Sequence, residues 1–303
     1  MYSENSSIQS GNSSRFTFKA IGTHWEIETS NPLKNRLKNK ILNRIELYDQ
    51  TYSRFRHDSL VSQIAQSQEG GRFDFPNDSV KLFKFYEELC TLTDGAVDPL
   101  VGRDLELLGY DKEYTFLPKK ATVLNQEKPS WLTDIDREAT SIVTKKPLVI
   151  DVGAAGKGYL VDIVSEILLE EGFIDFIVDG SGDIRHVGKD NVAIGLEHPL
   201  HPNKVVGVIR LSNQAICASA INRRAWGDGL HHILHARTGT PVKNVIATWV
   251  VANNCMIADG LATALFFETG YKLAKDFTLS YVRMFADGTV EISDNFEGDI
   301  FTE

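Results

Sequence analysis

The sequence has few cysteines, no extended run of basic charge and no long apolar segment, and each shortage excludes a class of protein. Its 303 residues contain three widely spaced cysteines, Cys90, Cys217 and Cys255, with no CxxC pair. Such a sparse, odd set is typical of reduced thiols buried in a reducing compartment. No apolar run reaches the roughly eighteen residues that indicate a membrane-spanning helix. Residues 1–14 are rich in Ser and Asn and lack the basic start and apolar centre of a signal peptide. We therefore expect a cytoplasmic protein with no membrane span.

The net charge of the chain and the distribution of its basic residues limit the classes of partner that it can bind. The net charge is −9, and no basic cluster is longer than Lys119-Lys120 or Lys145-Lys146. Because nucleic-acid binding needs a basic patch, we expect no nucleic-acid partner. The signatures of serine hydrolases (GxSxG), zinc proteases (HExxH), P-loops (GxxxxGKS or GxxxxGKT) and dinucleotide folds (GxGxxG) are also absent from the sequence. Any catalysis must therefore depend on a less familiar set of residues.

The periodicity of apolar residues favours a mixed α+β fold. Residues 1–14 contain almost nothing to bury and are expected to form a disordered tail, and no linker or repeat divides residues 15–303. We expect one compact, two-lobed domain of mixed sheets flanked by helices. Apolar residues three or four apart predict helices near 37–49, 80–92, 158–170 and 257–267. Alternating or short apolar runs predict strands at 16–27 (broken around Gly22), 147–150, 176–178, 205–211 and 245–252, and a hairpin over 281–292.

Two segments carry most of the chemical information. Residues 257–265 place Asp259 and Thr263 four residues apart, on one face of a predicted helix. Residues 151–159 form a Gly-rich turn that contains Lys157, between an apolar run and a helical pattern. Hard oxygen ligands beside a Gly-rich, lysine-bearing turn suit a magnesium ion and a phosphate-containing ligand. The sequence thus points to a ligand-binding enzyme.

Each segment also has a purely structural interpretation. Small residues in a strand-to-helix turn can serve close packing alone. Asp259 can cap its helix, and Thr263 can bond the carbonyl group four residues back. Residues 231–239 are dense in histidine but have no cysteine or carboxylate at zinc-ligand spacing, so they suit a general base or a phosphate-binding group, or simply a polar loop. Aromatic residues and arginines in 52–56 suit contact with a planar ring or a place in the core.

Taken in order, these segments resemble the FAD:protein FMN transferase family, the ApbE-like flavin transferases. The resemblance spans about residues 16–295, and the order of several linked motifs is far more specific than any one of them. The motifs are Gly22-Thr23, Tyr52-Ser53-Arg54-Phe55 through Ser59, Thr93-Asp94-Gly95-Ala96-Val97-Asp98-Pro99, Asp151 to Asp162, Gly180-Ser181-Gly182-Asp183-Ile184-Arg185, His232 to Gly239 and Ala258-Asp259-Gly260-Leu261-Ala262-Thr263.

The resemblance implies a fold, a reaction and a set of site residues. It implies an α+β fold with FAD in a cleft between the lobes and Mg²⁺ on the FAD diphosphate. The implied reaction transfers FMN from FAD to a threonine or serine of an acceptor flavoprotein and releases AMP. By position, the Ala154 carbonyl, Asp259 and Thr263 would hold Mg²⁺, and His232 would be the catalytic histidine, with His235 beside it in the site. The FAD site would be lined by Ile21, Phe55, Ala96, Val97, Asp98, Asp151, Lys157 and Ile233.

The sequence departs from the family pattern at several positions around this site. His235-Ala236 stand where the family usually has Asp-Pro, and Ala218-Ser219-Ala220 where it has Thr-Ser-Gly. Phe55 and Asn222 replace tyrosines, and Ala65 replaces an asparagine. Loss of such supporting groups can reduce activity about 10- to 100-fold. Three activities therefore stay open: FMN transfer, hydrolysis of FAD to FMN and AMP, and FAD binding without turnover.

Overall fold

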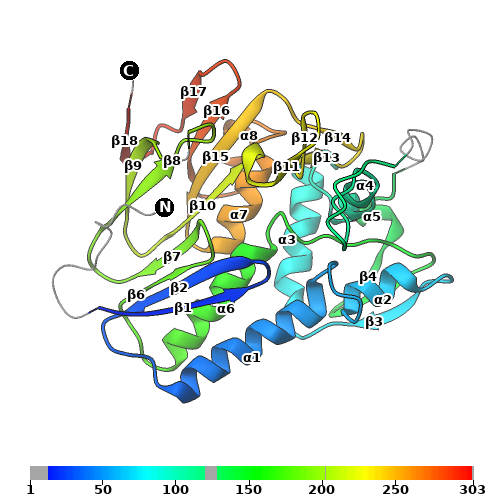
Figure 1. The fold of residues 1–303 in the computed structure, drawn as a ribbon, viewed down its shortest axis with the longest axis horizontal. Coiled ribbons are helices and arrows are strands. Elements are labelled where there is room, and N and C mark those ends of the chain that lie inside the picture. The colour runs from blue at the N-terminus through cyan, green and yellow to red at the C-terminus, as the bar shows by residue number, and fades with distance from the viewer. Residues whose placement is uncertain (1–12, 120–127, 202, 302–303) are drawn as a thin grey trace. The chain divides into compact units, whose positions relative to one another are not determined.

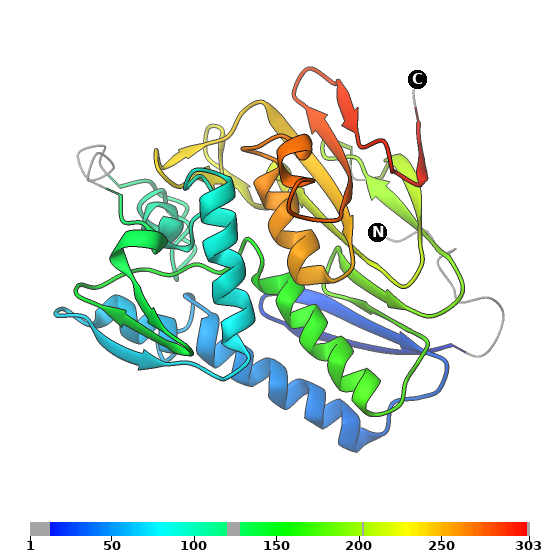
Figure 2. The same cartoon turned by 180° about the vertical axis from the view of Figure 1, so that it is seen from behind.

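Two compact units make up the chain in the computed structural model, which describes residues 13–119, 128–201 and 203–301. The first unit contains residues 1–45, 157–222 and 244–303, and the second contains residues 46–156 and 223–243 (Figures 1 and 2). Helices and antiparallel sheets occur in both, so the predicted α+β class is confirmed. The predicted tail falls mostly on residues 1–12, outside the described residues, and the first strand already begins at Ser14.

An eight-stranded antiparallel sheet organises the first unit. Its order is β1-β2-β6-β7-β10-β15-β16-β17, and every neighbouring pair is antiparallel. The predicted break near Gly22 and the predicted C-terminal hairpin are both confirmed. The strands are β1 (Ser14–Ala20), β2 (Thr23–Thr29), β6 (Phe176–Asp179), β7 (Asp183–Val187), β10 (Ala215–Ala220), β15 (Val245–Ala252), β16 (Ser280–Phe285) and β17 (Val290–Ile292).

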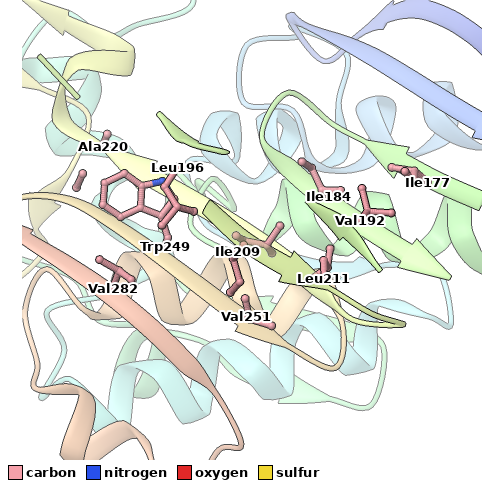
Figure 3. Packing of buried hydrophobic residues seen from close by; sticks show 12 residues of the cluster. Ile177, Ile184, Val192, Leu196, Ile209, Leu211, Ala220, Trp249, Val251 and Val282 are labelled. Carbon is pink, nitrogen blue, oxygen red and sulfur yellow. The ribbon is translucent and has the colours of Figure 1, made fainter. Parts of the chain in front are cut away.

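The core of the first unit lies on one face of this sheet. A second antiparallel sheet, in the order β18-β9-β8, is formed by β8 (Val192–Glu197), β9 (Val205–Leu211) and β18 (Gly298–Ile300). Side chains from both sheets form one buried apolar cluster, which includes Trp249, Val251 and Ile209 (Figure 3). Every residue of β15 is buried. The side chains of β15 that point away from this cluster face helix α7 (Cys255–Ala264), where the Thr248 hydroxyl donates to the Ala262 carbonyl.

The predicted long helices are confirmed, with their ends moved by a few residues. They are α1 (Asn35–Tyr52), α3 (Ser79–Leu92), α6 (Gly156–Glu170) and α7. The boundary between the units falls inside α1, after Ile45, and inside α6, after Gly156. The first unit also contains α8 (Gly270–Leu273) and the first two residues of η3 (Ile221–Arg224). Within the described ranges, no helix is long and apolar enough to cross a membrane.

The second unit consists of α3, shorter helices and small sheets. The short helices were not predicted, since three to seven residues are too few to show a helical period. They are α2 (Leu60–Gln66), η1 (Pro99–Val101), α4 (Gly102–Leu107) and α5 (Trp131–Asp134). The strands are β3 (Gly71–Asp74), β4 (Asp136–Glu138), β5 (Ser141–Thr144), β11 (Ala225–Trp226), β12 (Leu230–His231), β13 (Leu234–His235) and β14 (Thr240–Pro241).

The strand predicted at 147–150 is wrong. Residues 147–150 have no regular secondary structure, and the nearest strand, β5, ends at Thr144. Leu148 and Ile150 are nevertheless buried. Burial alone does not make a strand, however, and Pro147 has no backbone N–H to donate to a neighbour. The segment is instead held at its end, where Asp151 N–H donates to the Pro99 carbonyl.

Because Ile209 lies in the core between the two sheets, truncation of its side chain should strongly reduce the stability of the fold. Its side chain is 2% exposed, whereas that of Ile174 is 80% exposed. Ile209→Ala should lower the free energy of unfolding by about 2–5 kcal/mol, because it removes buried methyl groups and leaves a cavity. Ile174→Ala should change it by less than about 0.5 kcal/mol. Urea denaturation of both variants checks this, and equal losses would contradict the assigned core.

Candidate functional site

Gly158 lets helices α6 and α7 approach closely in the first unit. A Cβ atom at this position would lie 2.2 Å from the Cys255 carbonyl oxygen and 2.7 Å from Asp259 Cβ. Its backbone N–H donates a 2.9 Å hydrogen bond to Asp259 Oδ2. The glycine therefore serves packing and also fixes the Asp259 carboxylate. The alternative in which Asp259 caps α7 is wrong, because Asn254 is the N-cap residue and accepts from Ile257 N–H.

A buried group of three charged side chains lies at this helix contact. Lys157 Nζ is 3.0 Å from Asp183 Oδ2 and donates to the Ser181 carbonyl at 3.3 Å. Asp183 is fully buried, and Asp259 is 6% exposed. Burial and the Asp183 charge raise the pKa of Asp259 well above its usual value. Although burial opposes the charge of Lys157, Asp183 and Asp259 raise the pKa of Lys157. Two carboxyls therefore share one ammonium, and the group is short of one positive charge.

This shortage fits a cation. Asp259 and Thr263 are one turn apart on α7, so their side chains lie on the same face of the helix. Among the described residues, no group of three or more His, Cys, Asp or Glu side chains is arranged to hold a metal. A metal at Asp259 would thus have few protein ligands, as is usual for Mg²⁺, which keeps water and substrate phosphate as its other ligands. Ala154, the third predicted ligand, belongs to the second unit.

In the second unit, a buried ion pair joins two of the sequence motifs. Arg54 Nε donates to Asp151 Oδ2 at 2.5 Å, and Arg54 Nη1 donates to the Tyr110 carbonyl at 2.8 Å. Gly153 N–H donates to Asp151 Oδ1 at 2.6 Å. Burial alone would raise the pKa of Asp151, but Arg54 lowers it below its usual value. Arg54 Nη2 is buried and has no hydrogen-bond partner within the described part of the chain. It is a donor available to a ligand.

Aromatic rings surround this ion pair. The Arg54 guanidinium lies 4.2 Å from the centre of the Phe55 ring and 4.8 Å from that of Tyr110. Phe55 is parallel to Tyr114 at a centroid distance of 5.1 Å. Tyr110 in turn stacks on Trp226. Rings and guanidinium groups of this kind can hold a planar aromatic ligand. Phe55 also packs against an apolar cluster, and its contact with FAD stays a prediction.

The three histidines of residues 231–239 have different environments. His231 is buried and structural: its Nε2 is 2.9 Å from the Val242 carbonyl oxygen, and its Nδ1 accepts from Ile233 N–H. Burial and the Arg224 cation lower the pKa of His232 to about 3. His232 Nδ1 is buried with no partner among the described residues. Burial also lowers the pKa of His235, with a further contribution from Arg237. His232 is therefore neutral and can accept a proton or a hydrogen bond.

Residues 94–98 lie against the histidine segment within the second unit. Ala236 N–H donates to the Ala96 carbonyl at 3.0 Å, and Arg237 Nη1 donates to Asp94 Oδ2. Asp98 is 5% exposed, and its two oxygens accept from the N–H groups of Leu100 and Trp131. Its carboxylate is thus used in holding the backbone, and its contact with FAD stays a prediction.

The predicted site residues divide between the two units. Those of the first unit are Ile21, Lys157, Asp259 and Thr263, and those of the second are Phe55, Ala96, Val97, Asp98, Asp151, Ala154, His232, Ile233 and His235. Lys157 and Asp259 share one charged group, and Asp151 and His232 interact electrostatically. Ile21 is in the left-handed region (φ 44°), in the turn between β1 and β2.

Residues 21–282 match the model of the ApbE family. The chain belongs to the ApbE family. It is similar to a protein of Vibrio cholerae named FAD:protein FMN transferase, with 29% identity over 241 residues, which cover 76% of this chain and 72% of that one. A Haemophilus influenzae protein of the same name is 29% identical over 234 residues, covering 71% of this chain and 67% of the other.

The solved structures of the ApbE family agree with this fold. The crystal structure of the ApbE protein from Thermotoga maritima superposes with a TM-score of 0.81 at 26% identity and covers 93% of this chain and 97% of that one. The flavin transferase ApbE from Vibrio cholerae superposes with a TM-score of 0.79 at 23% identity, covering 94% and 98%.

Two charged residues of the site have partners that the sequence motifs do not reveal. Arg54 stands beside Phe55, and Asp183 ends the Gly-Ser-Gly-Asp turn. Their importance comes from partners far along the chain, Asp151 for Arg54 and Lys157 for Asp183. A charged residue next to an apolar strand or an aromatic residue is the one sequence signal that could have marked them, and it is a weak one.

We predict that His232 stays neutral at pH 5, since burial lowers its pKa to about 3. The unfolded chain would have an ordinary histidine pKa near 6.5. His232 therefore contributes stability that is fully present above about pH 6.5 and is lost as pH falls towards 3. Ring resonances followed by NMR from pH 8 to 4.5 test this, with His232→Asn used for assignment. A protonation midpoint between 6 and 7 for His232 would show that the ring is not buried as described.

Proposed function

We propose that this chain is a flavin transferase that uses Mg²⁺ to transfer FMN from FAD to a threonine or serine of an acceptor flavoprotein, releasing AMP. Membership of the ApbE family and relatives named FAD:protein FMN transferase support flavin transfer. The observation that carries the magnesium part is the buried group of Lys157, Asp183 and Asp259, which is short of one positive charge. The three free, buried cysteines support a reducing compartment, and we propose the cytoplasm.

The Asp259 carboxylate, the Thr263 hydroxyl and the Ala154 carbonyl are the proposed ligands of Mg²⁺. When bound, the ion would neutralise charge on the diphosphate of FAD. Lys157 would add a second positive charge for the same diphosphate, and its pairing with Asp183 keeps the ammonium protonated. The Arg54 guanidinium and the rings of Phe55 and Tyr110 would bind a planar ring of FAD.

In the proposed transfer, the hydroxyl oxygen of the acceptor attacks the phosphorus atom of the FMN half. A new phosphorus–oxygen bond forms, and the bond to AMP breaks, so that AMP leaves with the electron pair. The proton of the hydroxyl passes to a base, for which neutral His232 is the candidate. With a pKa of about 3, His232 is a weak base in the ligand-free protein. Most of the rate should therefore come from positioning and charge neutralisation.

One incubation separates this proposal from its two alternatives. The full chain is mixed with FAD, Mg²⁺ and a flavin-acceptor domain, and the acceptor is then weighed by mass spectrometry. Transfer adds the mass of FMN to the acceptor, and a serine- and threonine-free acceptor variant stays unmodified. Free FMN and AMP without modified acceptor would instead indicate an FAD hydrolase. Unchanged FAD would indicate a binding protein and would contradict both enzymatic functions.

Removing the Asp259 charge should abolish the dependence on Mg²⁺. Asp259→Asn keeps an oxygen that can accept from Gly158 N–H, and it leaves Lys157 and Asp183 as a balanced pair. We expect turnover to fall about 100-fold or more while the unfolding temperature is unchanged or rises, since a buried surplus charge is removed. Asp276→Ala, an exposed carboxylate of the same unit, is the control. Magnesium-dependent turnover that survives in Asp259→Asn would exclude this residue as a ligand.

His235 stands where the family usually has aspartate, so restoring the carboxylate should raise the rate. The pKa of His235 lies below 6.5, and the imidazole can accept a proton only above that pKa. We expect the transfer rate of the natural chain to fall as the pH drops below about 6.5. His235→Asp should increase the rate at pH 5.5 and flatten the profile, with His232→Asn measured alongside to separate the two rings. An unchanged rate and profile would mean that position 235 is structural.

A further inference from the structure

We infer that Asp162 is a positioning residue: by binding the first backbone N–H groups of α7, it fixes Asp259 and Thr263 for the metal. Both oxygens of its carboxylate are used. Cys255 N–H donates to Oδ1 and Met256 N–H donates to Oδ2, each at 2.8 Å. Asp162 is more than 90 residues away in sequence, on α6. This inference rests on the proposed function, because it concerns the ligands proposed for Mg²⁺.

The first turn of α7 has three N–H groups that need partners from outside the helix. The first N–H groups of any α-helix have no partner in their own helix. Asn254 accepts from Ile257 N–H at 2.9 Å, as an ordinary cap within the same segment. The other two, on Cys255 and Met256, donate to Asp162, which is their one partner among the residues that the structure describes. The start of α7 is therefore bound to α6, in addition to being capped by Asn254 of its own segment.

A second contact, one turn nearer the start of α6 and one turn further along α7, completes the attachment. Gly158 is four residues before Asp162 on α6, and its N–H binds the carboxylate of Asp259, which is four residues after Cys255 on α7. Two contacts at different heights fix both the rotation of α7 about its axis and its shift along α6. A rotation of α7 would move Asp259 and Thr263 together, since they share one face of the helix.

A carboxylate at position 162 is costly to bury, but it binds two N–H groups where a neutral cap would bind one. Burial raises the pKa of Asp162 to about 6, despite both backbone hydrogen bonds and the attraction of Arg185. A serine or asparagine would close one N–H group without that penalty. A carboxylate has two oxygens that can accept from two neighbouring N–H groups at once, whereas serine and asparagine have one. The charge is also favourable at the N-terminus of a helix.

The test is metal binding by the full chain, which does not require turnover. Mn²⁺ is titrated into the protein with and without saturating FAD, and free Mn²⁺ is measured by EPR. Asp162→Asn replaces one acceptor oxygen with an NH₂ group that faces an N–H donor. We expect it to weaken Mn²⁺ binding by about tenfold or more, as is common when groups that orient metal ligands are lost. High Mn²⁺ should restore binding to the level of the natural chain.

Two control variants separate positioning from charge and from helix stability. Glu166→Gln removes the same charge from an exposed position one turn along α6 and should leave Mn²⁺ affinity within about twofold. Asn254→Ala removes the cap inside α7 without touching α6, and should lower the unfolding temperature but keep Mn²⁺ affinity within about twofold. If Asp162→Asn does not fold, Asp162→Glu, which moves the carboxylate by one methylene, should weaken Mn²⁺ binding in its place.

Three results would overturn the inference. The first is Mn²⁺ affinity in the folded Asp162 variant equal to that of the natural chain. The second is an equal loss in Asn254→Ala at a matched unfolding temperature, which would mean that helix stability alone matters. The third is no binding of Mn²⁺ by the natural chain under either condition, and this result would remove the proposed metal itself.

Discussion

The pairing of one lysine with two buried carboxyls, in the group of Lys157, Asp183 and Asp259, is the constraint on which the site in the first unit depends. An unpaired charge in such a place is costly, so the group must take up either a proton or a cation. The raised pKa of Asp259 reflects the first choice in the absence of ligand. A divalent ion would replace that proton, as metal binding at carboxylates generally does. The fold preserves the imbalance because α7 is held on one side by the fully buried strand β15 and on the other by α6.

The two units have opposite ligand preferences. The first has surplus negative charge at the contact between α6 and α7, whereas the second has two arginines, Arg54 and Arg224, around one aspartate, Asp151. The second unit also has buried polar atoms without partners among the described residues, and a group of aromatic rings. A cation suits the first set, and a ligand with planar rings and acceptor oxygens suits the second. FAD with a magnesium ion has all of these parts, which is why the chemistry of both units favours the same proposal.

The sequence was a good guide to elements and a poor guide to contacts. Strand β15 and helices α6 and α7 could be predicted because each has a clear apolar period and is long enough to show it. The apolar run at 147–150 was wrongly predicted as a strand, since buried apolar residues also occur in irregular backbone. That Asp259 holds a metal stays a prediction from its motif. The contacts of Asp162 with α7 and of Arg54 with Asp151 could not be predicted, because these partners are more than 90 residues away and only the folded chain brings them together. The low pKa of His232 comes from its burial in the folded chain and from the nearby Arg224 cation, and no sequence motif indicates that burial.

The central claim is that the chain binds both a cation and FAD, and that each assists the binding of the other. It is tested most directly by the unfolding temperature of the full chain measured in four conditions: no ligand, Mg²⁺ alone, FAD alone, and both together. A ligand that binds the native state stabilises it, and two ligands that assist each other stabilise it by more than the sum of their separate effects. The account predicts a rise with both ligands that clearly exceeds the two single rises added together. Strictly additive rises, or no response to Mg²⁺ in the presence of FAD, would contradict it.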